Sequence, residues 1–196
     1  MGNSLKLSAK DITLIGLMVA IIEVCKVLMK DLPNIELTTF WIIMFTLYFG
    51  KKIIYVVPTF IIIEGTMFGF GMWWIMYLYL WPLLALVTWV FRKNNSAWFW
   101  AVIAGIFGLF FGFFGSFPYI VTSGPLAAFT WWIQGIPWDI THAVANFVLM
   151  LVLYQPIRQI MNRVNNMLIA YVLYIRRFYV IVIEIKKYRR YYEIQN

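Results

Sequence analysis

The sequence predicts an all-α membrane protein in which six transmembrane helices form a bundle with both termini in the cytoplasm. Its 196 residues are 63% hydrophobic and only 12% charged, and the mean hydropathy is +0.81. A soluble fold of this length could not bury so much apolar surface. Six apolar runs follow one another, each near the roughly 20 residues that cross a bilayer or somewhat shorter.

The first three helices are expected near residues 11–30, 37–50 and 52–68. The first apolar run follows Lys6 and Lys10 and has no small-residue cleavage site, so we interpret it as a membrane helix and not as a signal peptide. The other two are short, but a short helix can still span the membrane when aromatic side chains at its ends lie in the interface.

The last three helices are expected near residues 73–91, 97–120 and 137–156. Pro137 suits the first turn of a helix, where its missing N–H is no loss, so the sixth helix is expected to begin there. The fifth helix carries four glycines at spacings of 3, 4 and 3, which leaves bare backbone along one face. We expect another helix to pack closely on that face. The glycines are Gly105, Gly108, Gly112 and Gly115.

The basic residues predict the topology. They cluster before the first helix, in two alternate links and after the sixth helix, and all four clusters are therefore expected in the cytoplasm. The opposite links at residues 69–73 and 117–136 contain no Lys or Arg, and the first outer link carries charges of both signs. Topology thus explains the net charge of +8 better than nucleic-acid binding does.

We divide the chain into a six-helix membrane domain, residues 1–158, and a basic tail, residues 159–196. In the tail an apolar, aromatic stretch is split by Arg176 and Arg177, which a seventh span would bury in lipid. We therefore predict an amphipathic helix on the cytoplasmic leaflet, near anionic headgroups. A helix bound to a partner protein is the alternative.

Three ionisable residues, Glu64, Asp139 and His142, lie inside the apolar runs. A charged group costs roughly 2.5–3.5 kcal/mol at the centre of a bilayer, so each should face a polar cavity or a partner. Asp139, His142 and Asn146 are spaced 3 and 4 and therefore share one face of the sixth helix. This face either binds a ligand or holds the bundle together through interhelical hydrogen bonds.

Two aromatic clusters are expected at the same outer level as these polar residues. A belt at the membrane interface would explain the rings without a ligand. With the polar residues, however, they also fit a pocket for a flat or bulky solute. The candidate substrate-binding residues are Glu64, Trp73, Trp74, Tyr77, Trp132, Gln134, Trp138, Asp139, His142 and Asn146.

We expect no enzyme, metal site or cofactor. One histidine and one cysteine, Cys25, supply neither a zinc site of the usual composition nor an internal disulfide. Ser116 and Ser123 could pair with His142, but no nucleophile-elbow motif surrounds them. The chain also lacks a glycine-rich loop ending in Gly-Lys-Ser or Gly-Lys-Thr, so it cannot drive transport by itself through a Walker site.

Two stretches carry a resemblance to a known family. One runs from residues 33–37 (Pro-Asn-Ile-Glu-Leu) through a short helix to residues 49–52 (Phe-Gly-Lys-Lys), and the other is residues 135–143 (Gly-Ile-Pro-Trp-Asp-Ile-Thr-His-Ala). With six helices and cytoplasmic termini, residues 8–158 resemble the substrate-binding S component of energy-coupling factor (ECF) vitamin transporters. The long basic tail departs from the compact ends of that family.

The resemblance implies a protein of the cell membrane, here a bacterial plasma membrane, that captures a vitamin-type micronutrient at the extracellular face. Its partners would be a transmembrane coupling subunit and two cytoplasmic ATPases, and it would reorient in the lipid to release the solute inside. The family docks through an Ala-x-x-x-Ala face on the first helix, matched here by Gly16 and Ala20. Substrate would lie between the outer ends of helices four, five and six.

Glu64 and Asp139, with no Lys or Arg in the outer half of helices three to six, argue against a strongly anionic solute. Cobalamin or another corrinoid, riboflavin and a pyridoxine-like ring are compatible and are ranked in that order. The alternative class is a non-transport membrane scaffold or accessory subunit, in which the polar face of the sixth helix is structural.

Overall fold

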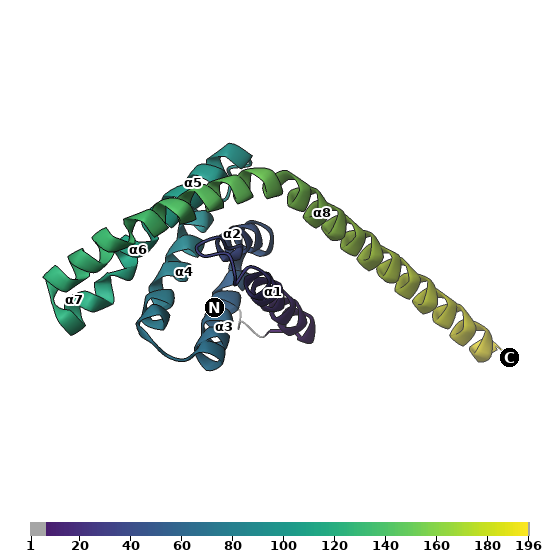
Figure 1. The fold of residues 1–196 in the computed structure, drawn as a ribbon. Coiled ribbons are helices and arrows are strands. Elements are labelled where there is room, and N and C mark those ends of the chain that lie inside the picture. Colours follow the sequence, from purple (N-terminus) through teal and green to yellow (C-terminus); the bar gives the residue numbers. More distant parts are fainter. Residues whose placement is uncertain (1–6, 196) are drawn as a thin grey trace. The chain divides into compact units, whose positions relative to one another are not determined.

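The protein is all-α in the computed structural model, which describes residues 7–195, with side chains described through residue 164 (Figure 1). The helices of this part of the chain are α1 (Ala9–Leu28), α2 (Thr38–Phe49), the short 3₁₀ helix η1 (Gly50–Lys52), α3 (Ile53–Phe68), α4 (Met72–Phe91), α5 (Ala97–Leu109), α6 (Phe111–Gly115), α7 (Phe117–Ser123) and α8 (Pro125–Gln195).

Among the residues whose side chains the structure describes, three helical runs are long and apolar enough to cross a membrane. They are Thr38–Phe68, which comprises α2, η1 and α3, then α4, and Pro125–Val164 of α8. The pair Ala97–Leu109 and Phe111–Ser123, bent by 42°, makes a fourth if its two parts form one span. α1, which carries Lys10, Asp11, Glu23 and Lys26, is not among them. The lengths and composition of these helices suggest a multi-pass membrane protein.

The first four helices begin and end within two residues of the predicted bounds. Ser8 and Asp11 form a capping box at the start of α1, in which the Asp11 N–H donates to Ser8 Oγ at 3.2 Å. Gly50 (φ 56°) ends α2 and Gly69 (φ 90°) ends α3, both in a backbone region that favours glycine. Lys52 Nζ lies 2.7 Å from Asp11 Oδ1 and joins η1 to the start of α1.

Two predicted boundaries are wrong. The fifth helix is not continuous over 97–120, because α5 ends at Leu109 and two short helices, α6 and α7, follow. The sixth helix does not begin at Pro137, since α8 begins at Pro125, directly after Gly124 (φ 87°), and continues through Pro137. Both prolines match a helix start in sequence, but only Pro125 follows a glycine turn. An internal proline is tolerated where neighbouring groups satisfy the freed carbonyl.

The glycine face of the fifth segment packs closely on α8, as predicted. A Cβ atom added at Gly108 would lie 2.8 Å from the backbone nitrogen of Ala143, and one at Gly105 would lie 3.3 Å from Phe147 Cβ. At Gly112 it would meet the carboxyl group of Asp139. Gly108 therefore needs glycine because backbone of α8 occupies the space, whereas a side chain at Gly105 or Gly112 would require α8 side chains to shift.

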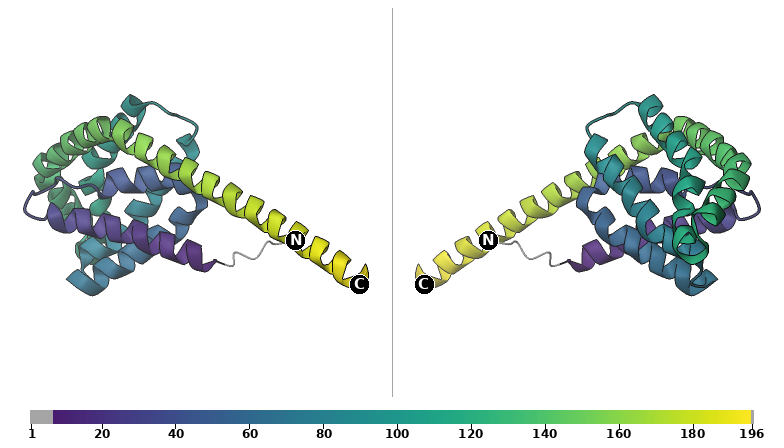
Figure 2. Two further views of the ribbon diagram at one scale, coloured as in Figure 1. Left: turned by 90° about the vertical axis from the view of Figure 1, so that its right-hand side faces the viewer. Right: turned by 90° about the vertical axis from the view of Figure 1, so that its left-hand side faces the viewer.

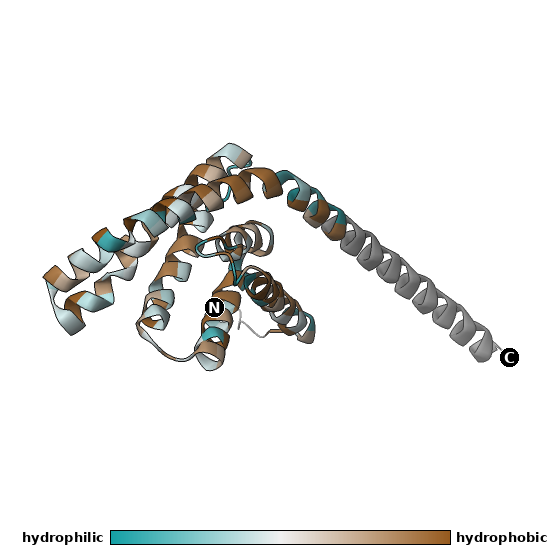
Figure 3. Cartoon of the chain, viewed as in Figure 1, coloured by the Kyte–Doolittle hydropathy of each residue, from teal (hydrophilic) through white to brown (hydrophobic). Residues whose placement is uncertain are grey.

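The chain divides into two compact units, one up to Gln155 and one from Pro156. In the first unit α2 packs on α4, and α3 packs on both α1 and α4 (Figure 2). The largest fully buried side chains there include Trp81, Trp100, Phe45 and Phe60. Large apolar side chains are also exposed on these helices, among them Ile12, Leu28 and Val152. Figure 3 colours the ribbon by hydropathy and shows hydrophobic residues along these helices. In the second unit α8 continues as a helix to Gln195.

Candidate functional site

The segment between α1 and α2 places a carboxylate at the start of α2. Its turn includes Asn34 at φ 58°, a conformation that asparagine tolerates better than most residues. The Glu36 carboxylate accepts hydrogen bonds from the backbone N–H groups of Thr38 and Thr39 and from Thr39 Oγ1 at 2.5 Å. The two N–H groups belong to the first turn of α2, where backbone donors have no acceptor within the helix and a negative charge is favourable.

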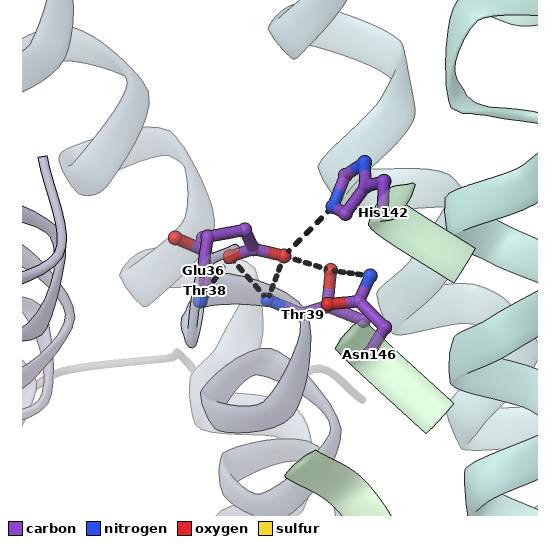
Figure 4. Close-up of polar contacts among 5 residues, drawn as sticks. All are labelled: Glu36, Thr38, Thr39, His142 and Asn146. Carbon is purple, nitrogen blue, oxygen red and sulfur yellow. Dashed lines mark hydrogen bonds and ion pairs between the residues drawn. The ribbon is translucent and has the colours of Figure 1, made fainter. Parts of the chain in front are cut away.

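Two side chains of α8 join this group (Figure 4). His142 Nε2 lies 3.2 Å from Glu36 Oε1, and because a carboxylate only accepts, this nitrogen is the donor. Asn146 Nδ2 donates to Thr39 Oγ1 at 3.2 Å. Burial alone would raise the pKa of Glu36, but the hydrogen bonds from His142, Thr39 and Thr38 hold it below its ordinary value. Glu36 is therefore an anion at neutral pH.

A pocket of about 240 Å³ lies beside this network, and we call it the Glu36 pocket. Its walls combine the segment between α1 and α2 with rings from α4, α6 and α8. Trp81 is 2% exposed, and its indole N–H has no acceptor among the described residues. A buried donor without a partner is costly, so a solute that supplies an acceptor would be favoured here. The lining residues are Lys26, Met29, Lys30, Leu32, Pro33, Asn34, Ile35, Glu36, Thr38, Tyr77, Trp81, Phe111 and His142.

A second pocket of about 570 Å³ shares Lys26 and Lys30 with the Glu36 pocket; we call it the Lys26 pocket. The Lys26 ammonium forms an ion pair with Glu64, whose side chain is fully buried. The same nitrogen lies 5.3–5.7 Å from the ring centroids of Phe60, Phe68 and Tyr77, within the range of cation–π attraction. The lining residues are Glu23, Lys26, Val27, Lys30, Glu64, Met67, Phe68 and Trp73.

Asp139 makes a structural contact. Its Oδ1 accepts a hydrogen bond from the backbone N–H of Gly112 at 2.9 Å, in the first turn of α6. The break after α5 frees this N–H, so a carboxylate of α8 takes the place of a missing helix bond. Asp139 lies in the interior of its own helix, α8, and serves the N-terminal end of α6.

The structure brings five of the ten candidate residues to the two pockets or the network beside them. Tyr77 and His142 line the Glu36 pocket, and Glu64 and Trp73 line the Lys26 pocket. Asp139 and Asn146, which share a helix face with His142, are buried at 6% and 3% exposure, as the predicted inward orientation of this face requires.

Asp139, which contacts Gly112, and the other four candidates line neither pocket and take no part in this network. Trp74 donates its indole N–H to the Ile61 carbonyl at 2.8 Å. Trp132 packs edge-to-face on Phe113, with ring centroids 5.1 Å apart. Gln134 and Trp138 are exposed on α8, Trp138 by 56% of its surface.

Sequence reasoning missed Glu36 and Lys26 as site residues and treated both as link charges. Two signals were available. Glu36 precedes the threonines that begin α2, a pattern typical of a helix start. Lys26 follows a long apolar run, and a cation at membrane depth calls for a carboxylate partner, here Glu64. Lys26 lies on α1, outside helices three to six, whose lack of Lys and Arg in the outer half was the reason for expecting no strongly anionic solute.

The predicted docking residues lie on an open face of α1. Gly16 and Ala20 are exposed, and a Cβ added at Gly16 would meet nothing within 4 Å. Leu17 and Val24, each 57% exposed, extend this apolar surface.

Comparison with known proteins finds no matching family model, no matching curated protein and no matching solved structure. The fold and the pockets define a class: a helical protein whose long apolar helices suggest several membrane spans, with two polar pockets among them.

Proposed function

We propose that the chain is the membrane-embedded substrate-binding S component of an ECF-type importer. It captures a vitamin-type solute at the extracellular face of a bacterial plasma membrane and passes it on within an ATP-driven complex. It binds the solute and does not transform it, and it needs neither cofactor nor metal.

The Glu36 pocket is the observation that carries this proposal. It joins the two stretches of sequence that resemble the family, because Glu36 comes from the first and His142 from the second, and the two side chains meet at 3.2 Å. Tyr77, Trp81 and Phe111 supply rings against which a flat solute can stack. The unpartnered indole N–H of Trp81 supplies a donor.

The topology follows from the charges. Six spans require α1, α2 and α3 each to cross, with α5 to α7 forming one broken span, and the alternating basic links then place both termini in the cytoplasm. The charges of α1 are compatible with a span because Lys26 pairs with Glu64 inside the bundle. The Glu36 pocket then lies at the extracellular side.

The size of the pocket changes the order of the proposed solutes. At about 240 Å³ the Glu36 pocket suits a single ring system, and the Lys26 pocket of about 570 Å³ adds room beside it. A pyridoxine-like ring or a flavin fits this space better than a corrinoid, which would require the segment between α1 and α2 to move away. We therefore rank the corrinoid last.

The partners follow from the exposed face of α1. Gly16 and Ala20 let a partner helix approach the α1 backbone closely, which suits a transmembrane coupling subunit that carries two cytoplasmic ATPases. Lipid covers the remaining apolar surface.

A scaffold or accessory subunit is the second candidate function, and one contact favours it. The Asp139 carboxylate satisfies the backbone N–H of Gly112, which is the interhelical hydrogen bond that a purely structural polar face would make. Under this reading, changes at Glu36 and His142 would reduce the folded yield without affecting any solute.

The experiment compares Glu36→Gln with Asp31→Asn, which neutralises an exposed carboxylate of the same segment. The purified variants are titrated with riboflavin and pyridoxine by calorimetry in detergent. We expect wild type and Asp31→Asn to bind one of these vitamins and Glu36→Gln to bind it at least about tenfold more weakly, because a charged hydrogen-bond partner is lost. Equal affinity in all three proteins, or a loss of folded yield with unchanged affinity, would favour the scaffold.

A further inference from the structure

We infer that the Lys26 pocket is a subsite for an organic cation, an ammonium or similar group of the solute, and that the Lys26 ammonium occupies this subsite in its absence. The inference rests on the proposed function, because it assigns one end of the solute to the Lys26 pocket and the ring end to the Glu36 pocket.

The first observation is a surplus of buried carboxylate oxygens. Neither carboxylate oxygen of Glu23 has a hydrogen-bond partner among the described residues, and neither does Glu64 Oε1. All three atoms are shielded from solvent, and the Glu64 side chain is fully buried. Two carboxylates thus line the pocket with one ion-paired cation, Lys26, while the other cation in its wall, Lys30, is exposed. An unpaired buried carboxylate is costly, so the pocket favours a further positive charge.

The second observation is the aromatic surrounding of the Lys26 ammonium. Three rings, those of Phe60, Phe68 and Tyr77, lie within 5.7 Å of this nitrogen, and Glu64 pairs with it. Proteins bind the ammonium groups of ligands through cation–π attraction to aromatic rings, and a carboxylate among the rings adds an ion pair. A metal ion suits the site less well, because the described residues offer no group of three His, Cys, Asp or Glu side chains.

Lys26 can leave this position without unfolding. Its ammonium is carried on a flexible stem of four carbons, and its side chain also lines the Glu36 pocket, where the Glu36 carboxylate offers another partner. A solute ammonium could therefore replace it beside Glu64. The exchange keeps Glu64 paired, moves Lys26 to the Glu36 carboxylate and adds a positive charge near Glu23.

The test uses 2-phenylethylammonium as a probe and 2-phenylethanol as its neutral counterpart, both titrated by calorimetry into the detergent-purified full chain at neutral pH. Lys26→Met removes the internal cation. We expect this variant to bind the ammonium at least about tenfold more tightly than wild type does, because the probe no longer competes with Lys26. Its affinity for the alcohol should not change.

Two further variants keep the test decisive. Adding Glu64→Gln to Lys26→Met removes both buried charges, so this double variant should fold even where the single variant does not, and it should lose the preference for the ammonium over the alcohol. Asp31→Asn, an exposed charge-matched control, should bind both probes as wild type does. Equal affinity of the Lys26→Met chain for both probes, or a preference for the ammonium that persists in the double variant, would overturn the cation subsite. Vitamin binding that is lost with Glu36→Gln would still support the proposed function in that case.

Discussion

Replacing Gly112 by alanine tests how α6 is held against α8. A Cβ at this position would lie 2.7 Å from Asp139 Oδ1 and 2.9 Å from its Cγ, too close for any real contact. The carboxylate must move and give up the N–H of residue 112. Loss of a charged hydrogen bond costs about 1.5–3 kcal/mol and overpacking about 1–3 kcal/mol, while alanine is favoured over glycine in a helix by about 1 kcal/mol. The net loss of unfolding free energy is therefore about 1.5–5 kcal/mol.

The assay is SDS-induced unfolding of the detergent-purified chain, followed by circular dichroism. Gly135→Ala is the matched control, because Gly135 lies on α8 and a Cβ there meets nothing within 4 Å. It should be neutral or stabilise the chain by up to about 1 kcal/mol. If Gly112→Ala unfolds at the same SDS concentration as Gly135→Ala, Asp139 does not hold α6, and the structural role given to it here is wrong.

Three further predictions concern the charged network and the docking face. Lys26→Met should destabilise the chain by about 3–5 kcal/mol by leaving Glu64 buried and unpaired, and adding Glu64→Gln should restore most of this loss in the same SDS assay. The lowered pKa of Glu36 contributes stability that is fully present above its unfolded-state pKa of about 4.3 and is lost as the pH falls through the lower folded-state value. The melting temperature of wild type should therefore fall more steeply below pH 4.3 than that of Glu36→Gln, and parallel curves would contradict this. The double variant Gly16→Leu, Ala20→Leu should lose its association with the coupling subunit in a detergent pull-down but keep vitamin binding. Normal assembly of this variant would exclude the face of α1 as the docking surface.

Much of the fold could be predicted because the bilayer limits the choices. Apolar runs alone locate α1 to α4 within two residues, and the spacing of Gly105, Gly108 and Gly112 predicts a closely packed helix, which is α8. The start of α8 could not be predicted in the same way. Both Pro125 and Pro137 satisfy the rule for a first helical turn, and only the backbone turn at Gly124 separates them.

The site was predicted where one helix carries it and missed where segments distant in sequence meet. Helical spacing alone places Asp139, His142 and Asn146 on one buried face. The partners of this face could not be read from spacing, since Glu36 lies 106 residues from His142. For the same reason the pairing of Lys26 with Glu64, 38 residues apart, followed only from the folded chain.

Native mass spectrometry of the detergent-purified chain, expressed in rich medium, tests the central claim most directly. The proposed function predicts a co-purified small molecule whose mass matches a vitamin and which is reduced or absent from the Glu36→Gln protein but retained by Asp31→Asn. A chain that carries no such molecule, and that acquires none from a panel of added vitamins, would contradict the solute-binding role and leave the scaffold as the function that the interhelical contacts support.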